Sequence, residues 1–429
     1  MKRKMMSFIL CAAMVGSMNT AGTVLVSADA EKVITVGYPS SLVPDAFNQV
    51  CDAAEEKLGV TIEAQPYADE SGETIFRSLL ASGEAPDVIL YNSGALLSKL
   101  NPSQYFADLS SYTELVDKLD KDFKESVTVD GAIYGIPQSS SQVGGVLYNK
   151  EMYEELGLEI PKTWDEFLAN CDALKDAGKT AVIGSFGSTW TSQLVFLADY
   201  FNVVAEEPDF SAKFEAGEAK YATTPAALRS FEKYEDLIPY YNEDCAVATY
   251  DDACTMLAEG DGAHYFMQSQ ALSNIYSLYD KETVDNIGFF PVPGDHADSN
   301  GMTVWPANAI YVNKDAKAEM EDIISFMEYY ISDEGMDIYA ETQPPVGPFN
   351  IVGYKLKGDP FAAVEQMQEY FDNGDTALAQ EYETSVKGAG CESICVEVSN
   401  GQITGQEAAE KYDLDCYKMA VQLGLDWEE

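Results

Sequence analysis

Three apolar segments near the start of the chain decide its fold class: KVITVG (32–37), VTIEA (60–64) and DVILY (87–91). Each is rich in β-branched residues, which is typical of strands. Between them, the spacing of apolar residues predicts helices over 45–58 and 73–82. This alternation predicts an α/β fold with a mostly parallel sheet covered by helices on both faces.

The same alternation continues through the remaining chain. At 429 residues, one hydrophobic core is not expected and two domains are the default. Further strands are predicted at 181–186, 262–267 and 286–294. Further helices are predicted at about 164–177, 190–201, 225–238, 250–259, 316–331, 333–341, 360–371 and 405–423.

In open sheets of this kind, ligands bind beyond the carboxyl ends of the strands. The residues that follow the first and third predicted strands are 38–41 and 91–94. We therefore expect these two segments to border a ligand site.

The charge balance excludes some partners. The chain has 26 Lys and Arg residues against 72 Asp and Glu residues, for a net charge of -46. Nucleic acids and anionic membrane surfaces are bound by concentrated Lys and Arg, so neither is an expected partner. Arginine occurs only at positions 3, 77 and 229. With so few guanidinium groups to grip phosphate or carboxylate, neutral ligands are favoured.

The first 30 residues have the pattern of a secretory signal peptide. Lys2, Arg3 and Lys4 precede an apolar run over 5–18, and Ala28-Asp29-Ala30 offers a cleavage site. We expect export and cleavage after Ala30. A transmembrane anchor is disfavoured because the run is shorter than the ~20 apolar residues that a span needs.

Beyond this leader the chain carries seven cysteines, an odd number that leaves at least one unpaired within the chain. Cys391 with Cys395, and Cys245 with Cys254, are close enough in sequence for disulfides, but spacing does not fix the pairing. Zinc is disfavoured because neither His264 nor His296 is near the C-x-x-x-C pair. A calcium loop at 296–301 is disfavoured because histidine takes the first acidic position. We predict no metal and no cofactor.

One long segment has a specific resemblance. DGAIYGIPQSSSQVGGVLYNKEMYEELGLEIPKTWDEF (130–167) is accompanied, in order, by EAPDVILYN (84–92), EGDGAHYFMQSQ (259–270), IGFFPVPG (287–294) and NGQITGQEAAE (400–410). This collinear set resembles the extracellular solute-binding proteins of bacterial ABC importers, family 1, the carbohydrate-associated and maltose-binding-protein-like group. The similarity extends over nearly the whole chain after the leader.

The resemblance implies a bilobal periplasmic-binding-protein-like fold, with two α/β lobes joined by a hinge of several crossings. The crossings are expected near 138–144, 291–295 and 342–347. The implied N-terminal lobe is 31–140 plus 295–342, and the C-terminal lobe is 141–294 plus 343–429. The implied function is capture of a neutral sugar or oligosaccharide between the lobes, for delivery by a monomer to ABC transporter permease subunits.

Sugar sites combine flat aromatic rings with Asp, Glu, Asn and Gln at the edges. The resemblance places seven candidate ligand contacts in such a site. The aromatic candidates are Tyr91, Trp190 and Trp305, and the polar candidates are Ser40, Asn92, Gln142 and Gln270. For each aromatic, simple packing is the alternative.

Four other residues are assigned to structure. Trp164 follows a capping box formed by Thr163 and Glu166, and it is expected in the core, as are Tyr148 and His264. Trp427 is expected to be exposed at the C-terminus.

Two functional alternatives stay open. The ligand could be another neutral or cationic solute, because acidic and aromatic residues together also suit a cation. A secreted glycosidase needs two carboxylates across a scissile bond, and 72 acidic residues make such pairs uninformative. Because no catalytic motif is found, we predict that the chain is not an enzyme. We also expect no lipid anchor, since Cys11 comes too early in the leader and lacks preceding small residues.

Overall fold

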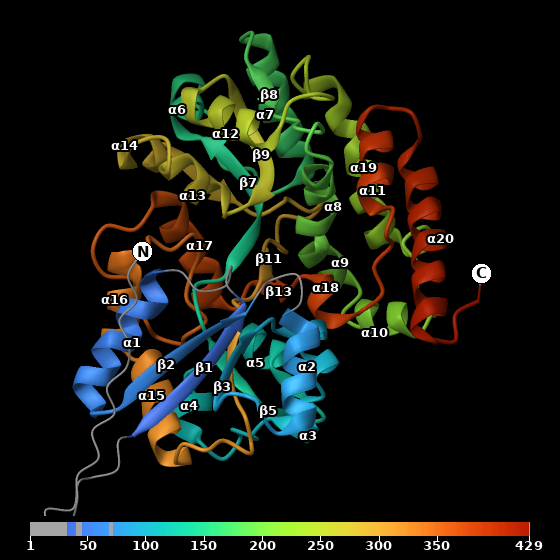
Figure 1. Cartoon of the computed structure of the whole chain (residues 1–429). Helices are drawn as coiled ribbons and strands as arrows, with labels where there is room; N and C mark the ends of the chain where they lie inside the picture. Colours follow the sequence, from blue (N-terminus) through green and yellow to red (C-terminus); the bar gives the residue numbers. More distant parts are fainter. Residues whose placement is uncertain (1–31, 40–44, 68–71, 429) are drawn as a thin grey trace, which may run out of the picture. The chain divides into compact units, whose positions relative to one another are not determined.

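The structure is a computed structural model that describes residues 32–39, 45–67 and 72–428. Two sheets, each with its own helices, organise this part of the chain (Figure 1). The signal peptide expected over residues 1–30 and the candidate Ser40 lie outside the described residues.

The first sheet has the strand order β2-β1-β3-β12-β6, in which only β12 runs antiparallel to its neighbours. Its strands are β1 (Val33–Pro39), β2 (Thr61–Tyr67), β3 (Val88–Tyr91), β6 (Gly135–Pro137) and β12 (Ala309–Val312). The prediction of a mostly parallel sheet is therefore confirmed here.

Helices cover both faces of this sheet, as predicted. Because β2 and β3 lie on opposite sides of β1, right-handed crossovers place the helices α1 (Asp45–Leu58) and α2 (Gly72–Ser82) on opposite faces (Figure 1). The helices α15 (Met320–Tyr330) and α16 (Asp333–Thr342) pack against α1. Residues of α1, α15 and the sheet share one core, which includes Phe47, Ile89 and Phe326.

Short elements lie between β3 and β6 along the chain: the 3-10 helix η3 (Gly94–Leu100), α3 (Pro102–Tyr105), α4 (Thr113–Val116), α5 (Lys121–Ser126), β4 (Thr128–Val129) and β5 (Ala132–Ile133). Asp130 and Gly131, both with positive φ (52° and 82°), make the tight turn between β4 and β5.

The second sheet has the order β13-β11-β7-β9-β8, and β10 also pairs with β7. Its strands are β7 (Gln142–Asn149), β8 (Thr180–Val182), β9 (Gly262–Gln268), β10 (Ile287–Phe290), β11 (Met302–Trp305) and β13 (Thr376–Leu378). The first half of β7 pairs with β11 and its second half with β10 along the same edge.

The helices that accompany this sheet are α6 (Lys150–Leu156), α7 (Trp164–Asp176), η4 (Thr189–Gln193), α8 (Leu194–Ala198), α9 (Tyr200–Glu206), α10 (Phe210–Glu215), α11 (Pro225–Leu237), η5 (Ile238–Tyr240), α12 (Tyr250–Glu259), α13 (Ala271–Tyr276), α14 (Lys281–Asp285), α17 (Ala362–Asn373), α18 (Gln380–Glu383), α19 (Cys391–Ser399) and α20 (Gly405–Leu423).

The predicted helix over 190–201 is interrupted. The hydroxyl of Thr303, on the neighbouring β11, donates to the carbonyl of Ala198 at 2.8 Å and accepts from the amide of Phe201 at 3.0 Å. These bonds satisfy backbone groups at the junction of α8 and α9 from outside the helix. The predicted strand over 181–186 also ends early, because the amide of Gly184 donates to the Asn242 side chain rather than to a strand.

The capping box of Thr163 and Glu166 is present, and Trp164, Tyr148 and His264 are buried as predicted. The expectation for Trp427 is wrong. Its indole packs edge-on against Phe214 at 5.1 Å and donates to the carbonyl of Glu215 at 2.9 Å, which leaves Trp427 only 6% exposed.

The chain crosses between the sheets twice through short connections, at 138–141 between β6 and β7 and at 306–308 between β11 and β12. The connection at 138–141 lies within the predicted crossing at 138–144. The crossing predicted at 291–295 is wrong, because β10 and β11, on either side of these residues, both pair with β7 in the second sheet. The chain returns to the first sheet only at 306–308. The assignment of whole ranges to the two lobes stays a prediction.

Candidate functional site

The two short connections bring one edge of each sheet together. Because β7 runs antiparallel to both β9 and β11, its first residue, Gln142, lies at the same edge as Trp305 and Gln268. In the first sheet, Tyr91 at the end of β3 pairs with Ala309 at the start of β12. The connection 306–308 joins these two edges directly, so the carboxyl end of β3 faces the second sheet.

A cavity of about 400 Å³, called cavity I below, lies at this junction. One wall comes from the segment after β3 and from η3, and the other from α18 and the segment after it. Its lining residues are Asn92, Ser93, Ala95, Leu96, Lys99, Glu381, Tyr382, Thr384, Ser385 and Lys387. The volume falls within the range of about 300–1,000 Å³ that is usual for small-molecule sites.

Glu381 is held in place at the wall of cavity I by two partners. It accepts a 2.6 Å hydrogen bond from Nε1 of Trp305 and forms a 2.7 Å ion pair with Lys387. Burial opposes the charged form of Lys387, but the nearby carboxylate outweighs it and raises the pKa of the ammonium group. Trp305 is only 5% exposed, so its indole supports this wall from behind.

Asn92 lines cavity I, whereas Tyr91 lies behind it. The Asn92 amide donates to Oδ1 of Asn308 at 3.3 Å, which ties the end of β3 to the connection 306–308. The Tyr91 hydroxyl lies 3.5 Å from Glu73. Burial, together with the Glu73 charge, raises the pKa of Tyr91 to about 12.

The other predicted residues lie on the second sheet and its helices. Gln142 is half-buried and opposite Trp305 in the β7–β11 pair. Gln270 is half-buried at the start of α13, and the adjacent Ser269 bonds to the backbone of Val143 at the same edge. Trp190 is half-buried in η4, with its ring 5.2 Å from that of Tyr250.

Of the described candidates, the structure therefore brings Asn92 into cavity I and Trp305 to its wall, with Gln142 beside Trp305. The sequence analysis missed the wall made by Glu381, Tyr382 and Lys387. This segment follows β13, a three-residue strand that was not predicted. The only local signal is the alternation of acidic and aromatic residues in QEYET (380–384), which is typical of sugar sites. No predicted strand precedes this segment, so the sequence alone does not place it near the site.

A second cavity, called cavity II, lies on the other side of Tyr382. Its volume is about 350 Å³, and its lining includes Ser98, Glu125, Thr128, Ser211 and Glu383. The Tyr200 hydroxyl donates to Glu383 at 2.8 Å. Burial, with a smaller contribution from Glu125, raises the pKa of Glu383 to about 7.

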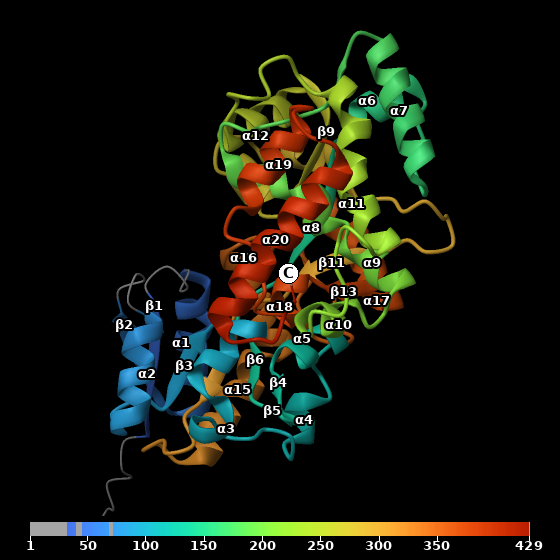
Figure 2. The same ribbon diagram turned by 90° about the vertical axis from the view of Figure 1, so that its right-hand side faces the viewer.

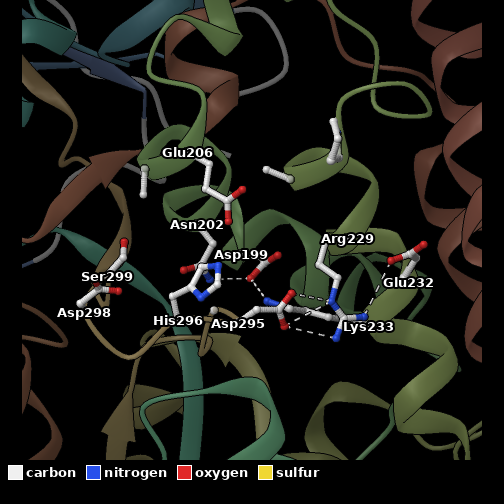
Figure 3. A pocket seen from close by; sticks show the side chains of 14 residues that line it. Asp199, Asn202, Glu206, Arg229, Glu232, Lys233, Asp295, His296, Asp298 and Ser299 are labelled. Carbon is white, nitrogen blue, oxygen red and sulfur yellow. Dashed lines mark hydrogen bonds and ion pairs between the residues drawn. The ribbon is translucent and has the colours of Figure 1, made fainter.

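A third cavity, of about 390 Å³, lies between α9, α11 and the loop 293–299 (Figure 3). Its arginine and its lysine pair with carboxylates. Lys233 lies 2.5 Å from Asp199, and Arg229 lies 3.0 Å from Asp295 and 3.2 Å from Asp236. This pocket is lined by internal ion pairs, and it contains none of the candidate residues. Within the described part of the chain, no group of three or more His, Cys, Asp or Glu side chains is placed to hold a metal ion.

The family described as bacterial extracellular solute-binding protein matches residues 40–337, which is more than half of the chain. The chain belongs to this family. The resemblance drawn from the sequence is thereby confirmed, and proteins of this family are solute-binding rather than catalytic. No helix within residues 32–39, 45–67 and 72–428 is both long and apolar enough to cross a membrane.

Individual relatives agree with this assignment. An uncharacterized ABC transporter extracellular-binding protein of Pyrococcus horikoshii is 25% identical over 65% of this chain and 66% of its own length. The multiple sugar-binding protein of Streptococcus mutans is 25% identical over 66% of each chain. This solute-binding protein thus spans about two thirds of the length of the curated relatives that it matches.

The fold is also that of solved structures. A chitin oligosaccharide binding protein superimposes with a TM-score of 0.69 at 21% identity, covering 91% of this chain and 99% of that one. The bilobal α/β fold expected from the sequence is confirmed by this similarity.

Proposed function

We propose that this protein captures a neutral sugar or oligosaccharide in cavity I and delivers it to the permease subunits of an ABC importer. The observation that carries the proposal is that cavity I is built from both sheets. A ligand held by Asn92 on one wall and by Thr384 or Ser385 on the other would link the two lobes.

The chemistry of the walls suits a hydroxyl-rich ligand. Asn92, Ser93, Thr384 and Ser385 offer amide and hydroxyl groups, and Tyr382 offers an aromatic ring. The charged groups Lys387 and Glu381 neutralise each other at 2.7 Å. The third charged group of the lining, Lys99, lies 3.6 Å from Glu73 outside the cavity. Each charged group of the lining therefore has an opposite charge beside it, which suits a neutral sugar.

The names of relatives support the same ligand class. The Streptococcus mutans relative is named as a multiple sugar-binding protein. A glycosidase is disfavoured by cavity I itself, where Glu381 is the one carboxylate among the lining residues and is already bonded to Trp305 and Lys387. Glycoside hydrolysis usually needs a pair of carboxylates.

The remaining parts of the proposal concern the location and assembly of the protein. We propose export with cleavage after Ala30, no lipid anchor, and action as a monomer. Ser40, Trp190 and Gln270 are proposed to contact the ligand when the lobes close, in addition to the residues that line cavity I. Mass spectrometry of the secreted chain would reveal the cleavage site and any lipid.

Differential scanning fluorimetry and isothermal titration calorimetry would test the ligand class. The panel should contain neutral mono- and oligosaccharides, polyols and a polyamine. We expect saturable binding and a raised melting temperature with at least one sugar, since a ligand that binds only the folded state stabilises it. A response to polyamines alone would contradict the proposal, and turnover of a chromogenic glycoside would favour the enzyme alternative.

A matched pair of variants would assign binding to cavity I. Asn92→Ala removes a hydrogen-bonding group from its wall and should weaken sugar binding by about tenfold, as the loss of one good hydrogen bond does. Asn400→Ala, at the exposed end of α19, should leave binding unchanged. Equal affinities for both variants would place the ligand elsewhere.

A further inference from the structure

Tyr382 stands between the two cavities at the junction of the lobes. Tyr382 and Ala95 line both cavity I and cavity II, whereas the remaining lining residues belong to one cavity or the other. Figures 1 and 2 both place α18, which carries Tyr382, close to α10, and the contacts between elements agree and add η3 as a neighbour of α18.

The ring of Tyr382 is fixed by contacts with both walls. A Cβ atom on Gly94 would lie 2.5 Å from Cδ1 of Tyr382 and 2.8 Å from its Cα, so only glycine leaves room for this residue. Gly94 also has a φ of 67°, which favours glycine. Gly94 therefore has two independent reasons to be glycine, and one of them is the approach of Tyr382.

The hydroxyl of Tyr382 reaches the connection between the sheets. It donates to the carbonyl of Pro306 at 3.3 Å, within the segment 306–308 that joins β11 to β12. Burial raises the pKa of this phenol, so the hydroxyl stays protonated and can act as the donor. The side chain thus spans the space from η3 to the connection.

Cavity II, like cavity I, is lined by hydroxyl and carboxylate groups. Cavity II is lined by the hydroxyls of Ser98, Ser126, Thr128 and Ser211 and by the carboxylates of Glu125 and Glu383. Hydroxyls and carboxylates can accept hydrogen bonds from sugar hydroxyls. Without the ring between them, the two cavities would offer one site with roughly twice the space of cavity I.

We infer that Tyr382 sets the length of sugar chain that the protein accepts, by closing cavity I against cavity II. This inference rests on the proposed function. A chain that fills cavity I meets the Tyr382 ring at its end, and a longer chain must leave the site in another direction or bind less well.

Calorimetry with a ladder of sugars would test this inference. The probes are linear neutral glucose and galactose oligosaccharides, from monosaccharide to hexasaccharide, titrated into the wild type, Tyr382→Ala and Tyr382→Phe. In the wild type and in Tyr382→Phe, affinity should stop rising at the same chain length. In Tyr382→Ala that length should increase by at least one unit, with a gain of about tenfold or more for the longer sugar, given the usual binding free energy per ligand atom.

A second substitution separates the opening of cavity II from a general loosening of the site. Ser98 is exposed and lines only cavity II, so Ser98→Trp should fill that cavity. Ser98→Trp alone should keep the wild-type length preference, and Ser98→Trp combined with Tyr382→Ala should restore it. If Tyr382→Ala does not fold, Tyr382→Leu keeps an apolar contact with Gly94 and takes its place.

The outcomes are distinct. A wild type that binds sugars, together with a folded Tyr382→Ala or Tyr382→Leu variant of unchanged length preference, would overturn the inference and leave the proposed function standing. A wild type that binds no sugar of any length would contradict the proposed function, and the inference with it.

Discussion

The indole of Trp305 lies directly over Gly144, so that a Cβ atom at position 144 would come within 2.4 Å of Cζ3 of Trp305. The same Cβ atom would lie 3.0 Å from Cβ of Ala198. We therefore expect Gly144→Ala to destabilise the protein by about 1–3 kcal/mol, as overpacking of a tight core does. Urea unfolding followed by circular dichroism would measure the change in the free energy of unfolding.

A double-mutant cycle would attribute this effect to Trp305. Trp305→Leu removes the ring that a methyl group at 144 would strike. The effect of Gly144→Ala should therefore be smaller in the Trp305→Leu background, because residues in contact are not additive. An equal effect in both backgrounds would show that the strain comes from another neighbour.

The elements set by local pattern were predictable from the sequence. The helices α1, α12 and α20 begin and end at the predicted residues. Thr249 and Thr404 cap the starts of α12 and α20, and Gly260 and Gly424 end them. The break between α8 and α9 was not predictable, because it depends on the Thr303 hydroxyl, about 100 residues away in the sequence. Trp427 was misjudged for the same reason, since its partner Phe214 is distant in sequence.

The candidate site was predictable on one side only. Asn92 follows a clear buried strand, and the rule for strand ends places it at the cavity. Glu381 and Lys387 follow β13, which pairs through only three residues with β11. A strand of three residues is too short to show an alternation of apolar and polar residues in the sequence. The position of Glu381 and Lys387 therefore follows only from the pairing of β13 with β11 in the folded sheet.

The buried ion pair of Lys233 and Asp199 offers a second prediction. Both side chains are 1% exposed, with Nζ and Oδ1 2.5 Å apart (Figure 3). Lys233 also donates to the carbonyl of Pro293 at 2.8 Å. Lys233→Met should destabilise the protein by about 3–5 kcal/mol, because it leaves the Asp199 carboxylate buried without its cation. Thermal and urea unfolding would measure the loss.

An exposed pair serves as the control. Lys57 and Glu334 lie 2.6 Å apart, but each side chain is more than half exposed. Lys57→Met should therefore change the free energy of unfolding by no more than about 1 kcal/mol. Similar losses for both variants would mean that burial does not govern the strength of the Lys233 pair.

His264 predicts a dependence of stability on pH. The ring is fully buried, with Nε2 2.7 Å from the hydroxyl of Tyr153, and burial lowers its pKa to about 3. The unfolded chain takes up a proton below about pH 6.5, whereas the folded chain does not until about pH 3. The stability due to neutral His264 is therefore complete above pH 6.5 and is lost as the pH falls toward 3, at roughly 1.4 kcal/mol per pH unit.

Comparison with His264→Gln isolates this contribution from that of the many carboxylates. The variant should be less stable than the wild type at pH 7.5, and the difference should shrink as the pH falls to 4.5, because glutamine takes up no proton. A difference between wild type and His264→Gln that stays constant with pH would contradict the assignment.

The cysteines give a prediction that also tests processing of the leader. All seven in the described part of the chain are thiols, including Cys391 and Cys395, and Cys245 alone among them is not fully buried. Burial raises the pKa of the Cys245 thiol, so a thiol reagent at pH 8 should label one group per native molecule slowly, since the thiolate is the reactive form. Cys245→Ser should abolish this native labelling.

A thiol count in guanidinium without reductant tests the leader and the disulfides. A chain cleaved after Ala30 should give seven thiols and an uncleaved chain eight, because Cys11 lies in the leader. Five thiols in the cleaved chain would reveal a disulfide and contradict the prediction.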